Sequence, residues 1–169
     1  MQNADAINAG IPEQPKVNYL TNGFTLKSWL LTKDHKRIAL MYLISVSLFF
    51  LGGGLYASAI RLELLTPASD LMQSATYNKA FTQHGILMIF FFLIPSIPAI
   101  LGNFLLPLMI GAKDLALPRI NLLSLYLYWI GGILTVYALL QGGVDTGWTF
   151  YTPYSTTFSR SEERRVGKE

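Results

Sequence analysis

Long stretches without any charged residue set the pattern of this chain. Residues 38–60, 85–112 and 120–144 contain no Asp, Glu, Lys or Arg. Each stretch is longer than the roughly 20 residues that a helix needs to cross about 30 Å of hydrocarbon. A backbone inside lipid must satisfy its own polar groups, so stretches of this kind form helices. The pattern therefore predicts an all-α membrane protein with three transmembrane helices.

The charged residues between the apolar stretches predict how the chain is oriented. Lys33, Lys36 and Arg37 precede the first stretch, and the 113–119 turn carries two basic residues against one aspartate. The segment 62–79 is mixed in sign. Because positively charged flanks favour the cytoplasmic side, we expect the amino terminus and the 113–119 turn inside and the 62–79 segment outside.

Two side chains stand at opposite ends of the second apolar stretch. His84 precedes this stretch, and Asp114 follows it in the turn. A metal-ligating imidazole at one membrane face and a carboxylate at the other indicate a metal or cofactor site combined with a route for protons. Asn103 lies inside the same stretch and fits either an interhelical hydrogen bond or the lining of a watery path.

Two further residues beside the membrane have competing interpretations. Arg61 follows the first stretch. Its guanidinium either reaches lipid headgroups at the interface or binds the acidic group of a buried cofactor. His35 lies within the charged run before the first stretch and is expected to be a solvated interfacial residue.

Composition narrows the classes of function. The sequence is 51% hydrophobic and 14% charged, and its net charge of +3 is spread over loops. No basic surface interleaved with aromatics is present, which argues against nucleic acid as a partner. The absence of cysteine excludes disulfides, iron–sulfur clusters and thiolate metal sites within this chain.

We expect a polar cytoplasmic tail over 1–37, the transmembrane part over 38–155, and an outer loop over 156–169 that ends in a non-native tail, SEERRVGKE.

Four segments carry a specific pattern. They are IRLEL at 60–64, YNKAFTQHG at 77–85, GNFLLPLMIGAKDLALPRIN at 102–121 and TGWT at 146–149. In this order the segments resemble subunit I of the haem–copper oxidases, the cytochrome c oxidase family. The resemblance extends over roughly residues 30–155, and its long block at 102–121 is the most specific part.

The resemblance implies a haem site at the outer face. His84 corresponds to one of the two axial histidine ligands of a low-spin haem, which we expect to be haem A. Arg61 corresponds to the arginine that hydrogen-bonds a polar edge substituent of that haem. Tyr77 and Trp148 correspond to residues near the haem propionates. Two imidazole ligands leave no open position on the iron, which suits electron transfer rather than oxygen binding.

The resemblance also implies a proton-channel entrance at the inner face. Asp114 corresponds to the carboxylate at the channel mouth, and Asn103 and Asn121 correspond to amides that line its entrance. The charge pattern independently places Asp114 inside. Lys113 stands where a proline is common in the family, and Phe104 stands where a tryptophan often follows the asparagine. Neither difference removes a ligand or a protonatable group.

The function implied by the resemblance is that of a terminal respiratory oxidase. Such an enzyme takes electrons from cytochrome c, reduces oxygen to water and translocates protons in a bacterial-type inner membrane, together with other oxidase subunits. The family bundle has about a dozen helices and holds a second haem and copper, so this chain is expected to be a fragment that is inactive by itself. A quinol oxidase and a non-enzymatic three-helix membrane or transporter protein are the alternatives.

Overall fold

The computed structural model describes residues 18–21, 23–67 and 71–157. Within these residues every regular element is a helix. Three spans are long and apolar enough to cross a membrane: His35–Glu63, Ser74–Met109 and Pro118–Leu140. The prediction of an all-α protein with three transmembrane helices is confirmed.

Helix α2 (His35–Glu63) forms the first span. Asp34 caps its start, because the carboxylate accepts a hydrogen bond from the backbone N–H of Lys36 at 2.8 Å. This bond satisfies one of the amides that the start of a helix leaves unpaired. Inside the span, Ser45 and Ser47 donate their hydroxyl protons to carbonyls one turn earlier. Polar side chains in this helix therefore stay satisfied without water.

The second span is a continuous helix whose winding changes along its length. Helix α3 (Ser74–Ile86) is followed by two wider π-helical segments, η1 (Leu87–Leu93) and η2 (Ser96–Gly102), and then by α4 (Asn103–Met109). Pro95 lies between the two π-helical segments. Altered winding of this kind is typical where prolines interrupt the hydrogen-bond ladder.

A side chain from the third span compensates for Pro95. A proline has no N–H, so Pro95 deprives the carbonyl of Phe91 of its usual α-helical donor. The hydroxyl of Tyr128 donates to this carbonyl at 2.7 Å. Ser96 donates in the same region to the carbonyl of Phe92. The third span thus supplies the donor that the carbonyl of Phe91 lacks within its own helix.

Helix α5 (Pro118–Leu140) forms the third span and packs against α2. Its first position is a proline, which suits the start of a helix because the N–H there has no partner in any case. Gly132 faces Phe49 so closely that a Cβ atom on the glycine would lie 2.5 Å from the ring Cζ. The indole N–H of Trp129 donates to the Ser45 hydroxyl at 2.8 Å. A glycine and two polar side chains therefore fix this helix pair.

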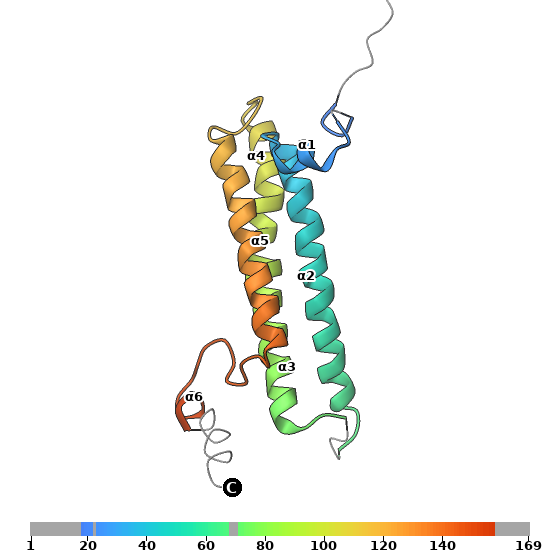
Figure 1. Cartoon of the computed structure of the whole chain (residues 1–169), viewed down its shortest axis with the longest axis vertical. Coiled ribbons are helices and arrows are strands. Elements are labelled where there is room, and N and C mark those ends of the chain that lie inside the picture. Colours follow the sequence, from blue (N-terminus) through green and yellow to red (C-terminus); the bar gives the residue numbers. More distant parts are fainter. Residues whose placement is uncertain (1–17, 22, 68–70, 158–169) are drawn as a thin grey trace, which may run out of the picture.

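The polar segments gather at the two ends of the bundle (Figure 1). Helix α1 (Leu26–Leu30) and the turn from α4 to α5 lie at one end, which we name the Asp114 end. The start of α3 and helix α6 (Tyr154–Thr157) lie at the other, which we name the His84 end. The two chemically interesting side chains thus stand at opposite ends, as the sequence predicts.

The buried core is small, and much of the helix surface is apolar and exposed. The core side chains are Ile38, Met41, Tyr42, Val46, Ile100 and Leu125. Leu48 and Ile133, by contrast, are 64% and 68% exposed in the middle of their spans. Apolar surface of this extent is typical of helices that face lipid or further helices. We conclude that this is an integral membrane protein.

Candidate functional site

The imidazole of His84 is oriented by the backbone of the neighbouring helix. His84 lies near the end of α3, and its Nδ1 forms a hydrogen bond with the carbonyl oxygen of Gly53 on α2 at 2.9 Å. A carbonyl accepts only, so Nδ1 carries the proton in this bond. The lone pair is then on Nε2, and a bond of this kind is typical of histidines that ligate metals.

Glycine makes this approach of the two helices possible. A Cβ atom on Gly53 would lie 2.8 Å from Sδ of Met88 and 3.0 Å from its Cγ. The neighbouring Gly54 has open space at the equivalent position, with no atom within 4 Å. Small residues let helix backbones approach closely in membranes. Gly53 therefore sets the distance at which His84 meets α2.

The segment after α5 folds back onto the turn that carries His84. The backbone N–H of Gly147 donates to Oγ1 of Thr82 at 3.0 Å. Trp148 lies over Gly85, where a Cβ atom would be 3.4 Å from the indole Cδ1, and its ring meets Phe90 edge-on at 5.5 Å between centroids. Trp148 thus packs against Gly85, the residue that follows His84, although 64 positions separate Trp148 from His84 in the sequence.

Tyr77 and Arg61 lie at the same end of the bundle without bonding to His84. Tyr77 is half-buried on α3, seven residues and about two turns before His84, so the two side chains share one face of the helix. Arg61 is exposed in the last turn of α2. Glu63 is 3% exposed and accepts a hydrogen bond from the backbone of Leu71 at 3.2 Å. The structure therefore places Trp148 against Gly85, next to His84 in the chain, and leaves Arg61 exposed.

The two predicted asparagines meet near the Asp114 end. Asn121 on α5 donates to Oδ1 of Asn103 at 2.7 Å, and Asn103 donates to the carbonyl of Ala99 at 2.7 Å. Asn103 is 5% exposed. Of the two interpretations of Asn103, the interhelical hydrogen bond is confirmed. Both amides also line an open pocket of about 490 Å³, so the second interpretation remains compatible with the geometry.

Two hydroxyl groups extend this polar row, and sequence reasoning missed both. Ser124 donates to the carbonyl of Asn121 at 2.7 Å, and its oxygen lies 2.9 Å from the hydroxyl of Tyr42. Because the single proton of Ser124 is used towards Asn121, Tyr42 is the donor in the second bond. Both hydroxyls line the same pocket as the asparagines. The signal was available in the spacing, because Ser124 follows Asn121 by three residues on one helix face.

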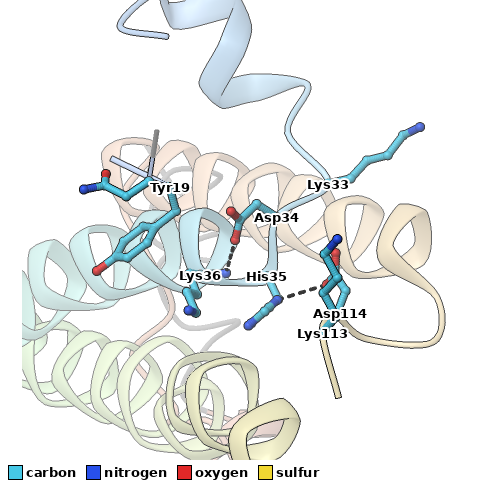
Figure 2. Close-up of a pocket in the computed structure, with 8 residues that line it drawn as sticks. Tyr19, Lys33, Asp34, His35, Lys36, Lys113 and Asp114 are labelled. Carbon is cyan, nitrogen blue, oxygen red and sulfur yellow. Dashed lines mark hydrogen bonds and ion pairs between the residues drawn. The ribbon is translucent and has the colours of Figure 1, made fainter. Parts of the chain in front are cut away.

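Asp114 is paired with a histidine that was expected to be solvated. Nδ1 of His35 lies 3.0 Å from Oδ1 of Asp114, and the same oxygen accepts the backbone N–H of Leu115 at 2.7 Å (Figure 2). The His35 residue is only 5% exposed, whereas the Asp114 side chain is 43% exposed. The expectation of a solvated His35 is wrong. His35 is the first residue of α2, and the start of this helix lies against the 113–117 turn. The imidazole of His35 is therefore buried between the helix and the turn.

The donor set at the His84 end fits an axial ligand and not a polydentate metal site. In the described part of the chain no three His, Cys, Asp or Glu side chains lie together as a metal would require. His84 offers one oriented imidazole nitrogen, and a haem iron takes one such ligand on each side. The residues present therefore fit one half of a bis-imidazole haem.

The fold and these two regions define a class: an integral, all-helical membrane protein with an oriented imidazole at one face and a carboxylate–amide row at the other. The family described as Cytochrome C and Quinol oxidase polypeptide I matches residues 37–166. The chain therefore belongs to the family of subunit I of the cytochrome c and quinol oxidases.

Individual relatives agree with this family. The chain is 42% identical to cytochrome c oxidase subunit 1 of Thermostichus vulcanus over 86% of its length, and 40% identical to that of Bacillus subtilis over 80%. It is 39% identical over 80% of its length to a probable quinol oxidase subunit 1 of Staphylococcus epidermidis. The matches span 26%, 22% and 20% of these relatives, respectively, so the chain corresponds to about a quarter of their length or less.

Proposed function

We propose that the chain is part of the catalytic subunit of a respiratory oxidase of the cytochrome c oxidase type, which reduces oxygen to water. In this proposal His84 is an axial ligand of a low-spin haem, and Asp114 stands at the mouth of a proton channel. The observation that carries the proposal is the 2.9 Å hydrogen bond between Nδ1 of His84 and the carbonyl of Gly53, within a chain of this family. That bond leaves Nε2 for the iron.

The residues around His84 have distinct tasks in this proposal. A low-spin haem A held there supplies a one-electron iron couple when bound. The Gly53 carbonyl holds the imidazole in the tautomer with a free Nε2. Trp148, which belongs to the segment after α5 and lies over Gly85, shields one side of the haem site. Arg61 and Tyr77 are assigned to the edge and propionates of the haem, and a second haem and copper belong to the longer subunit.

At the other face, Asp114, Asn103 and Asn121 are proposed to form the entrance for protons. Asp114 is 43% exposed at its side chain, so water reaches its carboxylate. The Asn103–Asn121 bond lies in the pocket that Tyr42 and Ser124 also line. Hydroxyl and amide groups of this kind order water molecules, and a chain of ordered water carries a proton.

The two histidines of the chain give a matched test of the haem assignment. In reduced-minus-oxidised optical spectra of the longer subunit in its membranes, His84→Ala loses the low-spin haem band. His35→Ala is the control, because His35 is the only other histidine in the sequence and lies at the opposite end of the bundle. A low-spin band of full size in His84→Ala would refute the assignment.

The proton entrance has its own test. Asp114→Asn removes the exchangeable carboxylate and is expected to slow proton uptake from the Asp114 side and oxygen consumption together. Asp145→Asn is the control, because Asp145 lies in the segment after α5 at the His84 end. Equal rates in Asp114→Asn and in the unmodified protein would show that protons enter elsewhere.

The electron donor is tested separately, because the relatives include both oxidase types. A quinol oxidase is the second candidate, favoured by the relative from Staphylococcus epidermidis at 39% identity. Membranes that contain the complete oxidase, with its other subunits, are expected to oxidise reduced cytochrome c. Oxidation of a quinol with no oxidation of cytochrome c would select the second candidate.

The proposed setting is a bacterial inner membrane, with residues 1–37 and the Asp114 end on the cytoplasmic side and 38–155 as the transmembrane part. The prediction of an outer loop over 156–169 lies almost entirely outside the described residues, which end at 157. The 169 residues contain no cysteine, so Lys27→Cys and Asp145→Cys each introduce a single labelling site within this part of the protein. In intact cells an impermeant thiol reagent is expected to label Asp145→Cys and to spare Lys27→Cys. The opposite result would reverse the orientation.

A further inference from the structure

An open pocket of about 500 Å³ lies at the Asp114 end, between the start of α2 and the turn that precedes α5. Lys33, Lys36 and Lys113 line this pocket, together with Tyr19. Figure 2 shows Lys36 next to Tyr19 on one side of His35, with Lys33 and Lys113 on the other. The ammonium of Lys36 lies 5.4 Å from the centre of the Tyr19 ring. Three cations from two separate segments of the chain thus surround one hollow.

The two carboxylates of this pocket are already engaged. Asp34 accepts the backbone N–H of Lys36 as the cap of α2, and Asp114 pairs with His35. The His35–Asp114 contact is the one contact within 4.0 Å between a basic and an acidic side chain found in the described residues. None of the three lysines forms a salt bridge with a carboxylate of that part of the chain, and the pocket lining holds three lysines against two carboxylates. The pocket carries an excess of positive charge that a bound anion would offset.

The position of the pocket along the membrane normal indicates the kind of anion. Lys33 and Lys36 flank the first residue of the span His35–Glu63, and Lys113 lies between the end of one span and the start of the next. Side chains at these positions stand where a bilayer has its headgroups. Basic pockets at the ends of transmembrane helices are suited to anionic lipid headgroups.

We propose that this pocket binds the phosphate headgroup of an anionic phospholipid. Lys33 and Lys113 are both exposed and offer charged donors to the phosphate oxygens from different segments. Lys36, whose ammonium lies over the Tyr19 ring, is the third cation that lines the pocket. Bound in this way, the lipid bridges the start of α2 and the turn before α5, beside Asp114. The proposal requires only that the chain lies in a membrane and does not depend on the haem or on the electron donor.

The test uses the protein in the complex in which it is purified from the membrane. Native mass spectrometry compares the retention of phosphatidylglycerol and phosphatidylcholine after incubation with an equal mixture of both lipids. Phosphatidylglycerol is expected to be retained preferentially. Lys113→Gln and Lys33→Gln are each expected to lower that preference about fivefold, which corresponds to about 1 kcal/mol for one lysine at a membrane surface. Both side chains are exposed, so neither substitution disturbs the packing of the helices.

Control variants separate a built site from general surface charge. Lys27→Gln removes a cation at the same end of the bundle, on α1 and outside the pocket, and is expected to leave the preference unchanged. Lys113→Arg keeps the charge and is expected to keep the lipid. Equal losses in Lys27→Gln and Lys113→Gln would overturn the proposal. Displacement of the lipid by an equal concentration of inorganic phosphate would also overturn it, since the site would then take a soluble anion.

Discussion

The spacing of α2 and α3 at Gly53 allows one prediction to be worked through in numbers. In Gly53→Ala the new methyl group would lie 2.8 Å from Sδ and 3.0 Å from Cγ of Met88, and 3.5 Å from Cβ of Leu87. Carbon and sulfur atoms at optimal separation are about 3.5–4.0 Å apart, so a movement of about 1 Å is required. Cγ of Met88 is bonded to Cβ, close to the backbone of η1, and it cannot move far without a new rotamer of Met88 or separation of the helices.

Two opposing terms determine the size of the effect. Overpacking a close helix contact costs about 1–3 kcal/mol. Replacing a helical glycine with alanine stabilises the helix by up to about 1 kcal/mol, because alanine has the higher helix propensity. Gly54→Ala carries only the second term, because nothing lies within 4 Å of its Cβ position. We therefore expect Gly53→Ala to be less stable than Gly54→Ala by about 1–3 kcal/mol.

The assay is unfolding of the purified protein in mixed micelles with rising dodecyl sulfate, followed by circular dichroism. A second measurement reports the site directly: the ¹⁵N chemical shift of His84 Nδ1 is expected to change in Gly53→Ala, because the 2.9 Å bond to the Gly53 carbonyl lengthens. Gly54→Ala is expected to leave this shift unchanged. Equal stability and equal shifts in the two variants would refute the claim that Gly53 sets the helix distance.

Three further predictions concern single hydrogen bonds and use the same unfolding assay or a fluorescence probe. Asn121→Leu removes the amide that donates to the buried Asn103 at 2.7 Å and is expected to lower the free energy of unfolding by about 1–2 kcal/mol. Leucine at both positions is expected to recover part of this loss, because no buried amide is then left without a partner. Equal stability of the single and double variants would contradict the argument. Tyr128→Phe leaves the carbonyl of Phe91 without its donor and is expected to destabilise by about 1 kcal/mol; an unchanged unfolding midpoint would show that this carbonyl finds another donor. Thr82→Val removes the acceptor for the backbone N–H of Gly147 in the segment after α5. The indole of Trp148, already 46% exposed, is expected to become more exposed, seen as stronger quenching of tryptophan fluorescence by acrylamide. Unaltered quenching would show that other contacts hold the segment.

The sequence by itself determined the number of spans, their approximate limits and the family. The spans follow from the cost of charge and unpaired backbone in lipid, which depends on local composition alone. The family follows from the resemblance of the four motif segments. The uncharged stretch 38–60 lies within the helix His35–Glu63, and 120–144 overlaps Pro118–Leu140. The separation of His84 from Asp114 by a whole span follows from the same reasoning, because the apolar run between them crosses the membrane.

Only the tertiary structure decided which side chains meet. The pairing of His35 with Asp114, across 79 positions, follows from how α2 is rotated against the turn before α5. The donation from Tyr128 to the Phe91 carbonyl, across 37 positions, follows from how α5 faces the second span. A membrane helix is apolar on every side, so its hydrophobic pattern does not specify which face meets which neighbour. Close packing at residues such as Gly53 and Gly132 fixes these rotations, and packing exists only once the helices are assembled.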